Sequence, residues 1–83
     1  MDRRLRKQAA FYTLASIVDA NNGNVVLGSD TIQRVFNDEN DIVMVEYASG
    51  EVGLAADVDI DTLESVIYEW RDNHPIEFDR LMK

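Results

Sequence analysis

The sequence predicts one small α+β domain, in which a three-stranded antiparallel sheet packs against helices in the order α–β–β–β–α, with a short C-terminal helix. Apolar residues recur at helical spacing in the first and last thirds of the chain. Between them, two apolar stretches flank a glycine-containing turn, which is typical of a β-hairpin. The 83 residues allow a single domain, residues 1–83, and 46% hydrophobic residues are enough for a core.

The first helix is predicted over residues 3–20, because Phe11, Leu14 and Val18 follow the i, i+3, i+7 spacing of one helical face. Residues 21–23, "NNG", provide the stop, since asparagine and glycine tolerate the left-handed conformation at a helix end. The basic residues at the start of this helix are placed unfavourably for its dipole. We therefore expect them to contact acidic groups elsewhere in the fold.

The segment before the hairpin is ambiguous. Residues 24–28 fit either a short strand or a buried connector. In residues 31–36, Ile32, Val35 and Phe36 have helical spacing, while Ile32 and Phe36 also fit the alternation of a strand. We favour a strand for residues 31–36, because a turn and a clear strand follow immediately.

The hairpin is the clearest prediction. Residues 42–48 and 51–57 flank a two-residue turn in which Gly50 can adopt a positive φ. A two-residue loop puts Tyr47 opposite Val52, so that one face is apolar and the other is wetter. The predicted apolar face consists of Val43, Val45, Tyr47, Val52, Leu54 and Ala56. The predicted wetter face carries Met44, Glu46, Glu51, Gly53 and Asp57.

A second helix follows the hairpin. Asp61 with Glu64 three residues later matches a capping box, so the helix is predicted to begin there and to end near Asn73. Its apolar stripe consists of Leu63, Val66, Ile67 and Trp70. Pro75 can start a last short helix. The residues of that helix expected to close the core are Phe78, Leu81 and Met82.

Two tyrosines, Tyr12 and Tyr68, fall off the main stripes of their helices. They are predicted to be partly exposed and to belong to a contact surface. Trp70 and Tyr47 each lie on an apolar stripe, so both are predicted to be core residues.

The charge is distributed unevenly. The chain has a net charge of −8, and residues 35–70 contain ten acids and no base. The acids of this stretch are Asp38, Glu39, Asp41, Glu46, Glu51, Asp57, Asp59, Asp61, Glu64 and Glu69. Phosphates would be repelled, so we expect no direct binding to nucleic acid, whereas a basic partner would be attracted. No run approaches the roughly 20 apolar residues that span a bilayer, which predicts a cytoplasmic protein without a membrane partner.

Residues that support catalysis or cofactor binding are scarce. There is no cysteine and only one histidine, His74, which is expected on the surface or as a helix cap. Asp57, Asp59 and Asp61 imitate the start of a calcium-binding loop, but the required glycine and the final glutamate are missing. The sequence therefore predicts a protein that is not an enzyme, with no catalytic residue, no cofactor and no metal site.

If strand geometry continued beyond the hairpin, Asp57, Asp59 and Asp61 would form a row on one face. Duplex DNA carries one charge per about 1.7 Å of its axis, and a hairpin of similar length would present carboxylates at a comparable density. Such a surface could occupy the lysine- and arginine-lined groove of a DNA-binding protein. The alternative is that the carboxylates only keep a small protein soluble.

Residues 31–70 resemble the small acidic phage anti-CRISPR proteins that mimic double-stranded DNA, most nearly a type I-F inhibitor. The similar features are Phe36 before an Asp/Asn turn, an apolar strand that runs into the Ser49-Gly50 turn, and an Ala-x-Asp stretch followed by a helix ending near Trp70. The chain departs from that pattern in its basic N-terminus and in lacking a strongly acidic C-terminal tail.

The resemblance implies a phage protein that binds a host CRISPR surveillance complex in the bacterial cytoplasm and blocks its DNA-binding groove. The residues carried over from the resemblance are Asp38, Asp41, Asp57, Asp59 and Asp61. The charge pattern alone adds Glu39, Glu46, Glu51 and Glu64. Two rivals stay open. One is an antitoxin-like or oligomeric interaction module with a merely solubilising acidic face, and the other is a phage sponge for a nucleotide signal. The sequence leaves the oligomeric state open.

Overall fold

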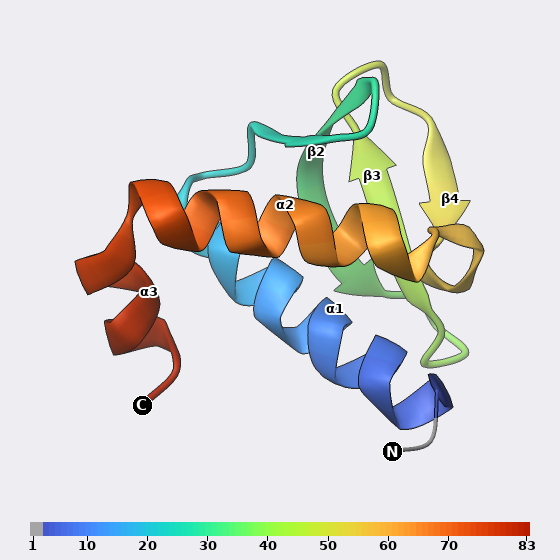
Figure 1. Ribbon diagram of the computed structural model, residues 1–83. Helices are drawn as coiled ribbons and strands as arrows, with labels where there is room; N and C mark the ends of the chain where they lie inside the picture. The colour runs from blue at the N-terminus through green and yellow to red at the C-terminus, as the bar shows by residue number, and fades with distance from the viewer. Residues whose placement is uncertain (1–2) are drawn as a thin grey trace.

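The computed structural model describes residues 3–83, with the side chains from Leu5 onward, and shows a small α+β fold (Figure 1). The elements are α1 (Arg3–Ala20), β1 (Val25–Leu27), β2 (Asp30–Asn37), β3 (Val43–Tyr47), β4 (Val52–Leu54), the 3-10 turn η1 (Ala55–Asp57), α2 (Ile60–Asn73) and α3 (Pro75–Leu81). The sheet is antiparallel in the order β1-β2-β3-β4. The α+β prediction is confirmed, but the prediction of three strands is wrong, because four are present.

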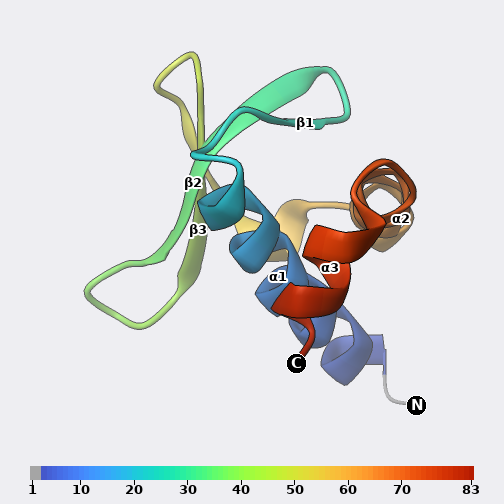
Figure 2. The same ribbon diagram turned by 90° about the vertical axis from the view of Figure 1, so that its left-hand side faces the viewer.

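The helices of the described chain lie on one side of the sheet and leave its other side uncovered (Figure 2). α1 lies across β2, α2 packs on α1 and reaches β1, and α3 contacts both helices. The core lies between these layers, and its most completely buried side chains are Leu14, Ile17, Val18, Ile32, Val45 and Leu63. The uncovered side of the sheet is therefore available for contacts with another molecule.

α1 has the predicted bounds and the predicted end. The N–H of Asn21 donates to the carbonyl of Ile17 at 3.0 Å, and the N–H of Gly23 donates to the carbonyl of Val18 at 2.8 Å. Gly23 has a φ of +76°, which closes the last turn of the helix.

β1 is the strand that the sequence left undecided. Val25 pairs with Ile32 and Leu27 pairs with Asp30, across a tight turn in which Gly28 has a φ of +65°. With three residues β1 is shorter than a typical strand of about five or six, so its alternation is too brief to be recognised.

Residues 31–36 belong to a strand, as favoured, but the strand is irregular. The pairing of β2 with β3 shifts between Ile32 and Arg34, which leaves Gln33 as the extra residue of a bulge. The bulge lets Ile32 and Val35 both face the helices, while Arg34 is exposed. A spacing of three between two core residues is what made this segment look partly helical.

The predicted register of the β3–β4 hairpin is wrong by one residue. Glu46, not Tyr47, stands opposite Val52. The N–H of Tyr47 donates to the carbonyl of Glu51 at 2.9 Å, so the loop has three residues and ends at Gly50, with a φ of +95°. This is a three-residue hairpin loop with its glycine in the left-handed position.

The shift divides the predicted apolar face. Val45 is fully buried, whereas Val52 is 49% exposed and Leu54 is 40% exposed on the uncovered side of the sheet. Gly53 faces the helices with Val45, and a Cβ placed on Gly53 would lie 3.7 Å from the ring of Tyr47. The tyrosine ring therefore covers the glycine, and this packing favours the observed register over the predicted one.

α2 begins two residues earlier than predicted. Its cap is Asp59, whose side chain accepts a hydrogen bond from the N–H of Thr62 at 3.2 Å, so the predicted capping box of Asp61 and Glu64 is wrong. The earlier start places Ile60 inside the helix, where it is buried in the core. Burying this extra apolar residue favours the cap at Asp59.

The C-terminal segment covers the end of α2. Trp70 is buried as predicted, and its ring stacks on His74, which caps α2, with ring centroids 4.6 Å apart. Phe78 and Leu81 pack against the core, as expected. Met82 does not close the core, because it lies beyond the end of α3 and is 46% exposed.

Candidate partner-binding site

The nine predicted partner-binding carboxylates form two groups of three and three separate positions in the fold. The β2–β3 turn carries Asp38, Glu39 and Asp41, the segment from η1 into α2 carries Asp57, Asp59 and Asp61, and Glu46, Glu51 and Glu64 lie apart on β3, on the β3–β4 turn and on α2. Each of the nine is exposed or half-buried, so water reaches all of them.

Asp57, Asp59 and Asp61 do not form the predicted row on one face of a strand. β4 ends at Leu54, and the chain then turns through η1. Asp59 serves as the cap of α2 and Asp61 lies in its first turn. Both carboxylates interact favourably with the positive end of the helix dipole. The alternation of acids with Val58 and Ile60 resembles a strand, but here it spans a 3-10 turn and a helix start.

Asp57 and Asp59 instead line a small polar hollow together with Asp30, an acid from the start of β2. The hollow has a volume of about 290 Å³ and lies between the β1–β2 turn and the start of α2. Asp30 could not be grouped with the other two from the sequence, because it lies far from them in the chain and comes close only through the fold. Three like charges in one hollow favour a cationic side chain.

The β2–β3 turn is held by its own polar groups. The carboxylate of Asp38 accepts hydrogen bonds from the N–H groups of Asn40 at 2.8 Å and Ile42 at 2.9 Å. Asp41 has a φ of +62°, and its carboxylate accepts a hydrogen bond from the side chain of Asn37 at 3.0 Å. The turn therefore presents its carboxylates in a defined arrangement.

Two of the nine carboxylates are paired within the chain. Glu46 forms an ion pair with Arg34 at 3.0 Å, and the guanidinium of Arg34 lies 4.1 Å from the centre of the Phe36 ring. Glu64 pairs with Arg6 of α1, whose Nε lies 3.3 Å from a carboxylate oxygen. These two carboxylates are partly neutralised, which leaves seven for an external partner.

Arg6 does what was expected of the basic start of α1, since it contacts an acid elsewhere in the fold. The hydrogen bond to Glu64, and then the Coulombic attraction of that carboxylate, raise the pKa of Arg6 above its ordinary value. Any stability from this shift is complete below the ordinary pKa of arginine and is lost only as the pH rises through the raised value. Lys7 donates to the carbonyl of Ala56, while the side chains of residues 1–4 lie outside the described part of the chain.

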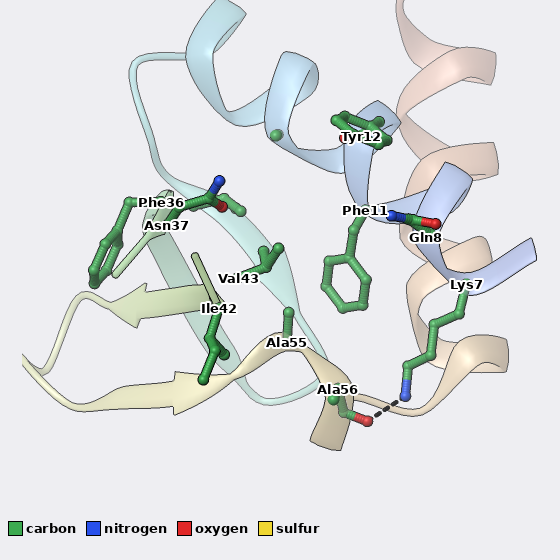
Figure 3. Close-up of a pocket in the computed structure, with 12 residues that line it drawn as sticks. Lys7, Gln8, Phe11, Tyr12, Phe36, Asn37, Ile42, Val43, Ala55 and Ala56 are labelled. Carbon is green, nitrogen blue, oxygen red and sulfur yellow. Dashed lines mark hydrogen bonds between the residues drawn. The ribbon is translucent and has the colours of Figure 1, made fainter. Parts of the chain in front are cut away.

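A larger, apolar cavity of about 430 Å³ lies between α1 and the sheet (Figure 3). The ring of Phe11 points into it from α1, and Val43 and Ala55 approach it from β3 and η1. At its margin Tyr12 is 72% exposed, in agreement with the prediction that this tyrosine belongs to the surface. Sequence patterns cannot reveal this cavity, because its walls come from four separate elements.

Within residues 3–83 no group of three potential ligands is placed to hold a metal ion. No helix in that range combines the length and the apolar character that crossing a membrane requires. Comparisons with known protein families, with curated proteins and with solved structures found no match for this chain.

Proposed function

We propose that this protein is a non-enzymatic inhibitor that binds a basic nucleic-acid-binding protein through an acidic surface and blocks its binding to DNA. The observation that carries the proposal is a set of seven carboxylates that form no ion pair with the described side chains. The seven are Asp38, Glu39, Asp41, Glu51, Asp57, Asp59 and Asp61. Their charge is left for a partner to neutralise.

The physical argument rests on fixed charges. A groove that binds DNA is lined by lysine and arginine side chains placed to meet phosphates. Asp38, Asp41 and Asp59 are held by hydrogen bonds to their own turn or helix end, so little ordering is needed when they meet such a groove. The net charge of −8 adds long-range attraction, which speeds association with a basic partner at low salt.

The polar hollow supports the same proposal. Asp30, Asp57 and Asp59 line one space that is large enough for a cationic side chain to enter. A lysine or arginine of the partner that entered this space would be attracted by the negative charges that line it.

The resemblance to phage anti-CRISPR proteins gives the proposal its specific form. The partner we propose is a type I CRISPR surveillance complex in the cytoplasm of the infected bacterium. The basic N-terminus departs from that family, but the pairing of Arg6 with Glu64 gives part of it a role within the fold.

The test compares two triple variants that each remove three negative charges. Asp57→Asn, Asp59→Asn and Asp61→Asn should weaken binding to the partner by more than tenfold, because three negative charges are lost from the proposed interface. The variant should still fold, since asparagine keeps the capping oxygen at residue 59. The control is Asp72→Asn, Glu77→Gln and Asp79→Asn, at the far end of α2 and on α3 (Figure 1). Equal affinities for the two variants would contradict a localised acidic interface.

A second candidate function is favoured by the uncovered side of the sheet, where Val26 on β1 is 60% exposed and Val52 and Leu54 are exposed on β4, at the opposite edge. These side chains suit an antitoxin-like or oligomeric interaction module that binds through apolar contacts. Salt distinguishes the two candidates. Binding through carboxylates weakens steeply as ionic strength rises, while binding through apolar side chains does not.

A further inference from the structure

The apolar cavity lies between α1 and the sheet of a chain whose net charge is −8. Its floor and walls come from Phe11, Val35, Val43 and Ala55, and its volume of about 430 Å³ falls within the range of roughly 300–1,000 Å³ that is common for binding sites. It lies beside the β2–β3 turn, because Asn37 and Ile42, at the two ends of that turn, also line it.

The side chains at its margin are large, apolar and in contact with water. Tyr12, Ile42 and Val43 are all exposed at the opening. An occupant with a large apolar side chain would remove these groups from water and would fill the space above the ring of Phe11 (Figure 3).

The two ends of the cavity carry opposite charges. Lys7 lies at one end, where it bonds to the carbonyl of Ala56 (Figure 3). Asn37 and Ile42 lie at the other end, next to Asp38 and Asp41 of the acidic turn. An occupant would therefore be oriented, with its positive charge toward the turn and away from Lys7.

We propose that this cavity is the anchor site for one large apolar side chain of a basic protein segment, with lysines or arginines next to that side chain lying against the β2–β3 turn. The inference rests on the proposed function, because the basic partner supplies the segment. It adds what charge alone does not provide, namely selection of one sequence among many basic ones. An apolar anchor in a pocket surrounded by polar contacts is the usual arrangement of an energetic hot spot.

The test uses three synthetic peptides and the wild-type protein, with binding followed by amide chemical shifts in NMR titrations at low salt. The first peptide is Lys-Lys-Gly-Phe-Gly-Ser-Ser, with lysines on one side of the phenylalanine only, the second has serine in place of phenylalanine, and the third has phenylalanine but serine in place of every lysine. We expect the first to bind at least tenfold more tightly than either of the others, with shifts at Phe11, Val43 and Ala55.

The other outcomes are distinct. Equal binding of the first two peptides, with shifts confined to the acidic turns, would overturn the anchor site and leave the proposed function intact. Equal binding of the first and third peptides would identify a purely apolar site and would overturn the role of the basic residues. Failure of all three to bind would count against both the anchor site and the acidic surface.

A cavity-filling variant gives an independent check. Ala15 is half-buried and lines the cavity, so Ala15→Leu should reduce the affinity for the first peptide by at least tenfold. The matched control is Ala9→Leu, at an exposed position of the same helix that does not line the cavity. Equal affinities of two folded variants would overturn the proposal, and the peptide comparison on the wild type decides the matter if Ala15→Leu does not fold.

Discussion

Gly23 lies directly against the backbone of Gln33: a Cβ placed on Gly23 would lie 2.6 Å from the carbonyl oxygen of Gln33. Gly23 ends α1, and Gln33 is the bulged residue of β2. This contact therefore joins the turn after α1 to the bulge of β2, where the alternation of core-facing and outward-facing residues shifts by one. A glycine at residue 23 allows both the positive φ and the close approach.

Gly23→Ala should be strongly destabilising for these two reasons. We expect the free energy of unfolding to fall by about 2–3 kcal/mol, since a strained backbone and a steric clash add together. The control is Gly50→Ala, because Gly50 also has a positive φ but a Cβ there would meet nothing within 4 Å. Backbone strain alone should cost about 1 kcal/mol. Urea unfolding of both variants measures the difference, and equal losses would contradict the contact.

The register of the β3–β4 hairpin can be tested with two valine-to-threonine changes. Val45 is fully buried, so Val45→Thr should cost about 1–3 kcal/mol, because a hydroxyl would be left without a partner in the core. Val52 is about half exposed, so Val52→Thr should change stability by less than about 0.5 kcal/mol. The two-residue turn predicted from sequence puts both valines in the core. Comparable losses of stability in the two variants, measured by thermal unfolding, would support that register instead.

The start of α2 makes a separate prediction. Asp59→Ala should reduce the free energy of unfolding by about 1 kcal/mol, because it removes the bond to the N–H of Thr62. Asp61→Ala should cost less than about 0.5 kcal/mol, since Asp61 makes no capping hydrogen bond and contributes only through its exposed charge, near the helix N-terminus and near Arg6. Asp59→Asn should keep the cap and most of the stability. A larger loss at Asp61 than at Asp59 would instead support the capping box expected from the sequence.

The acids that already have a partner should matter less for binding. Glu46→Gln with Glu64→Gln removes two carboxylates that arginines partly neutralise, whereas Asp57→Asn with Asp61→Asn removes two that have no described ion pair. Both double variants change the net charge equally. We expect a smaller loss of affinity for the proposed basic nucleic-acid-binding partner from the first pair than from the second, as measured by titration at low salt. Equal losses would show that total charge, not its placement, determines binding.

The helices could be predicted from the sequence because their patterns are long. Phe11, Leu14 and Val18 define one face of α1 over about two turns, and the "NNG" stop agrees with its end. The start of α2 was predicted less well. The sequence shows two acids that could cap the helix, and only the burial of Ile60 decides between them.

The sheet depends on contacts that a linear pattern does not contain. The choice between a two- and a three-residue turn follows from the packing of Tyr47 over Gly53, which are not adjacent in the chain. The bulge at Gln33 likewise changes the alternation of β2 partway along the strand. β1 was left open because three residues give no measurable period.

The candidate site was predicted in part. Most of the acids could be identified from the charge pattern, but their grouping could not. Asp30 joins Asp57 and Asp59 only because the β1–β2 turn lies against the start of α2. Glu46 and Glu64 are partly neutralised by arginines that are distant in sequence. The apolar cavity was missed entirely, since no single element contains its walls.

The central claim is that the acidic surface binds a basic nucleic-acid-binding protein. The most direct test is to immobilise the protein, apply nuclease-treated bacterial lysate containing a type I CRISPR surveillance complex, and elute with a salt gradient. We predict retention of the complex and its release at moderate salt, because screening weakens the carboxylate contacts. If the complex is not retained and nothing basic binds, or if retention persists at high salt, the acidic surface is not the interface.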